Sequence, residues 1–284
     1  MKLCLFTNIF WKHPLEDAVE AAARFGYRAV ELLVGWGANH LEHDMPESRI
    51  QEIKRTVDGH GLAVACIHTN LGGNAQLGMA DKGNETELET LRVFCEKAGA
   101  LNCDLLKVTC GRLVGDVVTA DDLQRCAEWL RRASDLAVEY GIRLAGEIHF
   151  GHMSETATQA ADVVDRVQRD NFGVIHDAGN LFVAGADYGE STVNTLGKRI
   201  FHVHIKDMKP CSDEREATFH YKGKHFRGAF LGEGDVDHRP VLRRLMDIGF
   251  TGCLSCECMK KDDPWETARR EAESLRSMLA ALNP

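Results

Sequence analysis

The chain lacks the features that mark nucleic-acid-binding and membrane proteins. It has 34 Lys and Arg residues against 43 Asp and Glu residues, a formal net charge of -9, so it offers no basic surface for a phosphate backbone. No apolar run reaches the roughly 18 residues of a membrane span, and the apolar part of MKLCLFTNIFWKHP is too short and polar for a signal peptide. We therefore expect a cytoplasmic protein without nucleic-acid or membrane partners.

Glycine-rich loops of the kind that hold phosphate groups are missing as well. A dinucleotide-binding sheet usually carries such a loop after its first strand, whereas residues 7–13 contain no glycine. The residues that follow Glu257 include no glycine-rich stretch either. A phosphate cup behind the last apolar run is therefore not supported.

The spacing of the ten cysteines does not indicate a disulfide framework or a structural zinc site. Most lie within apolar runs of a large chain, which favours reduced, buried thiols over the paired cysteines of small secreted domains. Cys253, Cys256 and Cys258 form a C-x2-C-x-C cluster, but structural zinc normally needs four ligands from paired motifs, and no second half follows. We interpret these cysteines as small buried residues.

What the chain does contain is a regular alternation of apolar runs and helical segments. Eight runs have the length and composition of buried strands: residues 2–7, 28–33, 62–68, 104–109, 143–148, 172–177, 200–205 and 252–257. Helical patterns cover residues 14–25, 47–60, 85–100, 119–140, 154–169, 191–196, 239–248 and 264–282, and Thr119 and Asp122 have the spacing of a capping box. Eight β/α repeats over residues 1–284 predict one domain, a single (β/α)8 barrel.

Residues 209–237 form a long loop after the seventh predicted strand. Connections longer than about 12 to 15 residues in a compact domain are usually functional or disordered, and this one leaves the face where barrels keep their active sites. Its aromatic residues Phe219, Tyr221, Phe226 and Phe230 could anchor it. Its basic residues, among them Arg227, could neutralise an acidic substrate group. The alternative is that the loop is a solvent-exposed connection without a function.

Four residues with metal-ligand side chains stand at the ends of four successive predicted strands: Glu147, Asp177, His204 and Glu257. The first three are 30 and 27 residues apart, which matches one strand plus one crossover helix. Three oxygen donors and one nitrogen donor suit Mn²⁺, Mg²⁺ or Co²⁺, with Zn²⁺ as a further option. The pattern predicts a metal site at the carboxyl end of the barrel.

Strand parity supports this prediction, because side chains alternate between the barrel interior and the helix layer. Counting back by two from each ligand places Ala145, Ile175, His202, Ile200 and Ser255 inside, together with Arg143, Gly173 and Cys253. The opposite parity places apolar residues such as Phe201 and Val203 against the helices. All four ligands are thus expected to point inward at the same end.

Other polar residues near these strand ends are candidates for substrate contacts: His68, Lys107, His149, Asn180 and Lys206. Lys107 points inward by parity, and a lysine inside a barrel needs a charged partner or a substrate. His68 and His149 could bind substrate oxygens or relay a proton, or could be satisfied loop histidines. His202 is expected to pack behind His204, and His176 is interpreted as structural.

The ligand set resembles the metal site of a known superfamily. Glu147, Asp177 within HDAGN, His204 within HVHIKD, and Glu257 are similar to the site of the xylose-isomerase-like TIM-barrel superfamily, the sugar phosphate isomerase/epimerase group. FGYRAVELL at 25–33 and LGEGDVD at 231–237 resemble its second strand and its segment after strand seven. Two features depart from its epimerase branch: Asn180 replaces a frequent histidine, and Lys209-Pro210 replaces an arginine.

The resemblance implies a proton-transfer enzyme of carbohydrate metabolism. In this superfamily a divalent metal stabilises an enediolate while a carboxylate removes the proton next to a carbonyl. Glu147 and Glu257 would act as base and acid and also touch the metal, whereas Asp177 and His204 would chiefly hold it. We expect a metal-dependent isomerase or epimerase that acts on a small carbohydrate substrate.

Three other functions are alternatives. A dehydratase or lyase acting on a keto-sugar or keto-inositol would use the same enediolate, and no residue in the sequence decides against it. A nuclease similar to endonuclease IV is disfavoured because Asn180, Lys107 and Thr109 stand where extra metal-binding histidines would be expected. A non-catalytic sugar-binding protein would have no reason to keep the four-ligand set. Many relatives form dimers or tetramers, so a homo-oligomer is an option.

Overall fold

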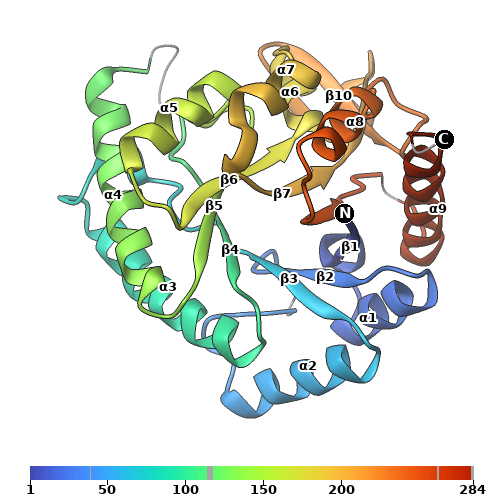
Figure 1. Cartoon of the computed structure of the whole chain (residues 1–284), viewed down its shortest axis with the longest axis horizontal. Coiled ribbons are helices and arrows are strands. Elements are labelled where there is room, and N and C mark those ends of the chain that lie inside the picture. The colour runs from blue at the N-terminus through green and yellow to red at the C-terminus, as the bar shows by residue number, and fades with distance from the viewer. Residues whose placement is uncertain (39, 114–117, 261, 283–284) are drawn as a thin grey trace.

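A closed barrel of eight parallel strands forms the centre of the computed structural model, which describes residues 1–38, 40–113, 118–260 and 262–282 (Figure 1). Around the barrel the strands follow the order β1-β11-β7-β6-β5-β4-β3-β2, and neighbouring strands pair in parallel. Their bounds are β1 Lys2–Phe6, β2 Ala29–Leu33, β3 Ala63–His68, β4 Leu105–Val108, β5 Arg143–Glu147, β6 Phe172–Asp177, β7 Ile200–Ile205 and β11 Cys253–Cys256. The predicted (β/α)8 barrel is confirmed, and each predicted strand lies within two residues of an observed one.

Helices surround the barrel and bury their apolar faces against its outer surface (Figure 1). They are α1 Leu15–Arg24, α2 Glu47–Gly59, α3 Lys82–Ala100, α4 Ala120–Val138, α5 Ala157–Val167, α6 Ala178–Ala184, α7 Glu190–Leu196, α8 Arg239–Asp247 and α9 Pro264–Leu282. Thr119 and Asp122 form the predicted capping box at the start of α4. No described helix is both long and apolar enough to cross a membrane.

The short helix α6 is absent from the sequence prediction because it begins directly after the strand residue Asp177. The Asp177 carboxylate caps it by accepting a hydrogen bond from the Asn180 backbone N–H at 2.8 Å. Seven residues are too few for a helical period to stand out from the strand before it. One side chain therefore both ends β6 at the barrel mouth and starts the helix.

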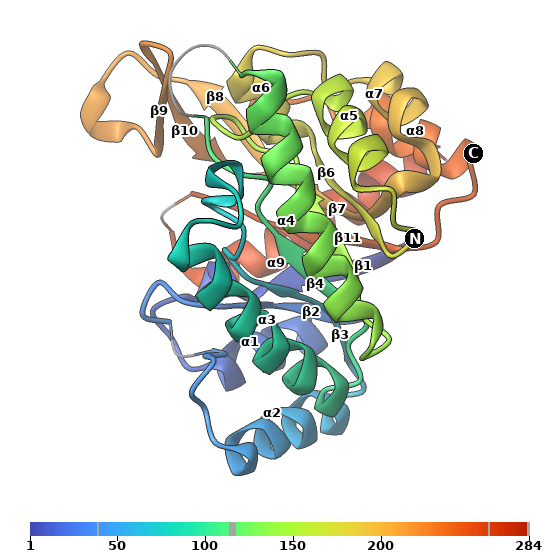
Figure 2. The same ribbon diagram turned by 90° about the vertical axis from the view of Figure 1, so that its left-hand side faces the viewer.

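The long stretch after β7 is not a plain loop, as the sequence suggested, but contains a small antiparallel sheet. Its strands are β8 Asp207–Pro210, β9 Phe219–Tyr221 and β10 Lys224–Ala229, in the order β8-β10-β9, and Figure 2 shows them at one end of the barrel, away from both termini. The turn between β9 and β10 is Lys222-Gly223, both with positive φ, which suits a tight hairpin. Phe226 and Phe230 are buried, and Phe219 and Tyr221 pack at the edge of a small core.

A β-bulge corrects one part of the parity prediction. The register between β6 and β7 shifts after Val174, so that Val174 pairs with Ile200 but Ile175 pairs with His202. Ile200 therefore packs in the core outside the barrel, and Phe201 lies against the interior cluster that includes Ala145 and Ile175. The predicted inward Ile200 and outward Phe201 are wrong because an extra residue in a bulge reverses the alternation that the count assumed.

The Asp207 carboxylate holds the LGEGDVD segment in place. Its Oδ2 accepts backbone hydrogen bonds from Gly232 at 2.9 Å and Gly234 at 3.0 Å, and its Oδ1 accepts one from Val236 at 3.1 Å. A methyl group at Gly234 would collide with this carboxylate. A strand-end aspartate thus organises the connection between the small sheet and α8.

Asp207→Asn is expected to destabilise the fold by about 2 to 4 kcal/mol, because the new NH₂ group faces backbone donors and leaves at least one buried N–H without an acceptor. Urea unfolding measures the loss. Asp213→Asn is the matched control, since Asp213 also accepts a backbone N–H but is partly exposed. Equal stability of the two variants would contradict the role given to Asp207.

The carboxyl group of Glu271 on α9 makes stability depend on pH. Glu271 is 1% exposed, its Oε1 accepts the Leu231 N–H at 2.9 Å, and its Oε2 has no partner in the described part of the chain. Burial raises the pKa of Glu271 to about 7. Because this pKa lies above the unfolded value near 4.3, the folded state binds more protons, and stability falls as pH rises from about 4 to about 7.

Glu271→Gln is therefore expected to gain stability over the wild type as pH rises, by about 3 kcal/mol between pH 4 and pH 8 at roughly 1.4 kcal/mol per pKa unit. Urea unfolding of both proteins across this range measures the difference, in which the contributions of all other groups cancel. A difference that stays constant with pH would show that Glu271 does not titrate in this window.

Candidate metal centre

The structure brings Glu147, Asp177, His204 and Glu257 together at the carboxyl end of the barrel. Glu147 and Asp177 end β5 and β6, His204 is the second-last residue of β7, and Glu257 follows β11. Their ligand atoms all lie within 4.8 Å of one another, and each residue is buried. The geometry expected from strand spacing and parity is thus present for all four side chains.

The ring of His204 aims one nitrogen at the three carboxylates. Its Nδ1 lies 3.1 Å from Glu147 Oε1, 3.1 Å from Glu257 Oε2 and 3.6 Å from Asp177 Oδ2. Its Nε2 faces the opposite way, 3.1 Å from Glu31 Oε1. A proton kept on Nε2 by Glu31 would leave the Nδ1 lone pair free to bind a metal, the tautomer that metal ligation requires.

Glu31 on β2 is the residue that the sequence reasoning missed. It is fully buried and contacts three histidines: His68 Nδ1 at 2.9 Å, His202 Nε2 at 2.9 Å and His204 Nε2 at 3.1 Å. Burial alone would raise its pKa, but His204 and His202 hold the pKa of Glu31 well below its usual range. A carboxylate inside the apolar run AVELL was the available signal, because such a group needs buried partners.

Two buried lysines offset part of the negative charge. Lys107 Nζ lies 3.3 Å from Glu147 Oε2, and Lys206 Nζ lies 3.0 Å from Asp177 Oδ2 and 3.2 Å from Glu257 Oε2. Against the effect of burial, Lys107 holds the pKa of Glu147 well below its usual range, and Lys206 lowers that of Asp177. Both carboxylates are therefore ionised at neutral pH.

The donor set fits a divalent cation. Counting Glu31, four buried carboxylates face two lysines and the ring of His204, so negative charge remains in excess beside Nδ1 even when that ring is protonated. Buried charges persist only when they are paired or coordinate a metal. Three carboxylates and one imidazole form a ligand set suited to a hard or borderline divalent ion.

Asn180, His68 and His149, predicted to bind substrate, all lie next to the four ligands. Asn180 Nδ2 donates to Asp177 Oδ2 at 2.9 Å and to Glu147 Oε1 at 3.2 Å, so in this structure it orders ligands. His68 stacks on Phe6 with ring centroids 4.5 Å apart while it contacts Glu31. His149 is partly exposed, and burial together with nearby Lys206 and Lys107 lowers its pKa.

Arg227 is not brought together with these residues. It lies on β10 and pairs with Glu216 at 2.8 Å, and none of its described contacts reaches the four ligands. The three-stranded sheet instead approaches the centre through Phe219, whose ring lies 5.9 Å from Lys206 Nζ. An aromatic residue of this segment, and not Arg227, is therefore the one that contacts a lysine of the site.

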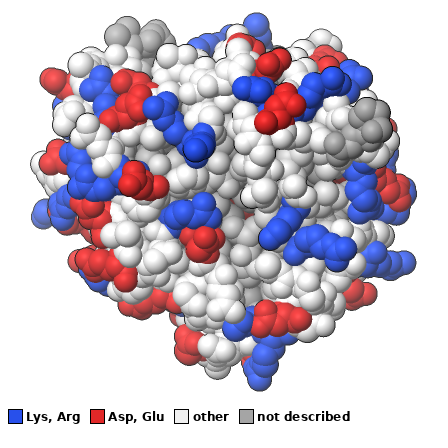
Figure 3. Space-filling model, in the orientation of Figure 1, with Lys and Arg blue, Asp and Glu red and all other residues white. Residues whose placement is uncertain are grey.

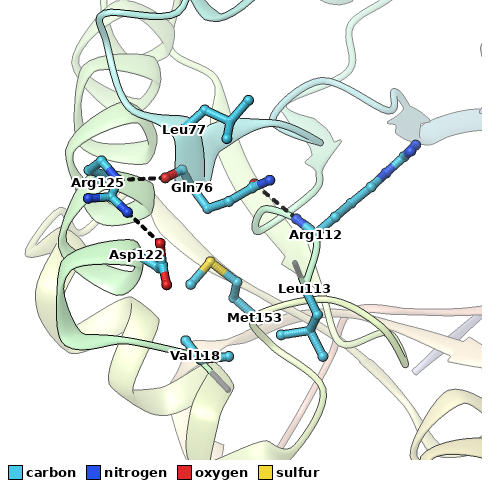
Figure 4. Close-up of a pocket in the computed structure, with 8 residues that line it drawn as sticks. All are labelled: Gln76, Leu77, Arg112, Leu113, Val118, Asp122, Arg125 and Met153. Carbon is cyan, nitrogen blue, oxygen red and sulfur yellow. Dashed lines mark hydrogen bonds and ion pairs between the residues drawn. The ribbon is translucent and has the colours of Figure 1, made fainter. Parts of the chain in front are cut away.

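Two cavities are lined mainly by loop residues that follow strands of the barrel. One, of about 390 Å³, is lined by residues that follow β3, β4 and β5, including Gln76, Arg112 and Met153 (Figure 4). The other, of about 630 Å³, is lined by residues that follow β1, β2, β8 and β11, including Asn8, Trp36, Thr218 and Met259. On the face shown in Figure 3, acidic and basic side chains are interspersed, with no broad basic area.

Comparison with known proteins defines the class. The sequence matches the family described as Xylose isomerase-like TIM barrel over residues 19–278, and the chain belongs to that family. It is 26% identical to the 2-oxo-tetronate isomerase of Haemophilus influenzae over 260 residues, 88% of this chain and 90% of that protein. It is 29% identical to the inosose dehydratase of Lactiplantibacillus plantarum over 154 residues, and this match spans about half (49%) of each protein.

Structural similarity extends over the whole barrel. The crystal structure of the IOLI protein with a bound zinc atom superposes with a TM-score of 0.78 at 20% sequence identity, covering 99% of this chain and 98% of that one. At this level of identity the similarity establishes the shared fold. The named relatives are enzymes of the isomerase and dehydratase classes, and both classes fit the site.

Glu31→Gln is expected to weaken divalent-metal binding by about 10- to 100-fold, because Glu31 orients the His204 ring and sets its tautomer. Isothermal titration of the metal-free protein with Mn²⁺ or Zn²⁺ measures the affinity. Glu87→Gln is the matched control, a half-buried carboxylate that accepts the Gly72 N–H away from the cluster. An unchanged affinity in folded Glu31→Gln would contradict the positioning role.

Proposed function

We propose that this protein is a divalent-metal-dependent isomerase or epimerase that transfers a proton at the carbon next to the carbonyl of a polyhydroxylated substrate. Glu147, Asp177, His204 and Glu257 would hold the metal. The match to 2-oxo-tetronate isomerase, which spans most of both chains, supports this class. A soluble carbohydrate is the expected substrate.

One observation carries the proposal: the two glutamates come from opposite ends of the ligand arc. Glu147 stands on β5 and Glu257 follows β11, and the strands between them, β6 and β7, supply Asp177 and His204. A substrate carbon held over the middle pair would have a carboxylate on either side. Such a pair can remove a proton from one face and return one to the same or the other face.

The metal, Glu147 and the two buried lysines would each have a separate role in the proton transfer. A bound divalent ion would supply positive charge where negative charge develops on the substrate oxygens. The lowered pKa of Glu147 keeps it deprotonated at neutral pH, the form that a general base requires. Lys107 and Lys206 lie within 3.3 Å of the two glutamates, so each could donate to a substrate oxygen once the substrate separates the ion pairs.

A dehydratase is the second candidate, because the inosose dehydratases are among the matched relatives. The same base would remove the proton next to the carbonyl. The resulting enediolate would then expel a β-hydroxyl group as water instead of being reprotonated on carbon. Lys206, beside Glu257, could protonate the leaving oxygen. A nuclease is not proposed, since the net charge is -9, and a purely sugar-binding role leaves the paired glutamates unexplained.

The test is NMR detection of deuterium entering the carbon next to the carbonyl in D₂O, with ketoses, 2-oxo-tetronates and keto-inositols, with and without Mn²⁺. Metal-dependent exchange is expected in the wild type, reduced at least about 1,000-fold in Glu147→Gln and Glu257→Gln, since each removes a general acid–base group and a ligand. Glu96→Gln, an exposed change on α3, is the control.

The product separates the two candidates. An isomer or epimer supports the proposed reaction, whereas loss of water identifies the dehydratase. Exchange that survives in both glutamine variants would contradict the assignment of the two glutamates. Absence of exchange with every compound, in protein shown to contain bound metal, would overturn the proposed function.

A further inference from the structure

The cavity of about 630 Å³ beside the metal centre has the features of a second binding site for substrate. Its volume lies within the range of roughly 300 to 1,000 Å³ found for small-molecule sites. Its wall includes Cys258 and Met259, which directly follow the ligand Glu257. Asn8, in the same wall, comes two residues after Phe6, whose ring stacks 5.8 Å from that of His204.

Two tryptophans expose their indole rings in this cavity. Trp11 is 44% exposed and Trp36 is 57% exposed. Lys12 Nζ lies over the Trp11 ring at 4.6 Å from its centroid. Two exposed indoles that line one cavity place a large apolar surface in water at one site, a feature of ligand-binding grooves.

The backbone around Trp36 is built to project this side chain. Gly35, Trp36 and Gly37 have φ angles of 82°, 60° and 71°. For a bulky residue such as tryptophan this region is strained, and such strain persists mainly at functional sites. The Gly35 backbone N–H donates a hydrogen bond to the Glu42 side-chain Oε1 at 3.2 Å, which fixes one end of the turn.

The polar lining of the cavity contains a buried amide with unused hydrogen-bonding capacity. Asn8 is 6% exposed, its Oδ1 has no partner in the described part of the chain, and its Nδ2 has only the Met259 thioether at 3.7 Å. A thioether is a weak acceptor. Lys12, His13 and Thr218 add further polar groups to the lining.

The cavity in Figure 4 differs in this respect. There the guanidinium of Arg125 pairs with Asp122 and donates to the Gln76 carbonyl oxygen, and Gln76 Oε1 accepts the Arg112 N–H. Its polar groups largely satisfy one another. Of these two cavities, the one with the tryptophans contains a buried amide, Asn8, whose oxygen has no hydrogen-bond donor in the described part of the chain.

We propose that the tryptophan-lined cavity binds a second sugar ring, so that the metal centre acts on a keto-glycoside in preference to a free ketose. A pyranose ring presents an apolar C–H face to an indole and hydroxyl groups to Asn8 and its polar neighbours, which matches both kinds of lining. This inference rests on the proton-transfer function proposed above and specifies its substrate class.

The test compares 3-keto methyl glucoside with 3-keto cellobiose, maltose and lactose in the deuterium-exchange assay. Trp11→Ala and Trp36→Ala are expected to raise KM about tenfold for a keto-disaccharide, while the constants for the keto methyl glucoside stay within about twofold. Trp36→Phe should restore most of the loss. Leu77→Ala, an exposed apolar residue in the other cavity, is the matched control.

The outcomes separate this inference from the proposed function. Exchange with the keto methyl glucoside but equal KM values for every variant would overturn the second-ring site and leave the function intact. If no compound exchanges, saturation-transfer NMR with cellobiose, maltose and lactose still reports binding of both rings. Transfer to the second ring that is lost in Trp36→Ala would support the site, and its absence in the wild type would overturn it.

Discussion

Four carboxylates buried side by side at the carboxyl end of the barrel, Glu31 among them, repel one another, and the surrounding groups are arranged to offset that repulsion. Lys107 and Lys206 reach the outer side of the cluster at 3.0 to 3.3 Å, and three histidines surround Glu31. In the low dielectric of a barrel interior these contacts are strong. The remaining negative charge is what makes the site suited to a divalent cation.

The two bulges show how strand geometry serves this cluster. One lies between β6 and β7 just before His202, and the other between β2 and β3 next to Glu31. A bulge re-aims the side chains that follow it, and here it lets His202 and Glu31 meet across the barrel at 2.9 Å. Glu31 in turn fixes the ring of His204. The geometry of the metal ligands therefore depends on a bulge two residues before Asp177 and His204 and on a second bulge next to Glu31 on β2.

Several elements were readable from the sequence because their signals are local. Strand and helix alternation, the Thr119–Asp122 capping box and the parity of the four ligands follow from spacing and side-chain type. The helix α6, the hairpin at Lys222-Gly223 and the inward turn of Phe201 were missed. The helix is too short for its period to stand out from β6, the three-residue strand β9 is too short to show an alternation before the turn, and a bulge reverses the parity of Phe201.

The sequence by itself determined the barrel and the four residues that could converge on a metal, because a period-two strand and a β/α repeat dictate which side chains share one end. Only the tertiary structure decided how that charge is compensated. The partnership of Glu31 with His68, His202 and His204 joins three strands across the barrel. Likewise the cavity with Trp11 and Trp36 is formed by segments from four separate repeats, and its shape depends on contacts that no sequence period encodes.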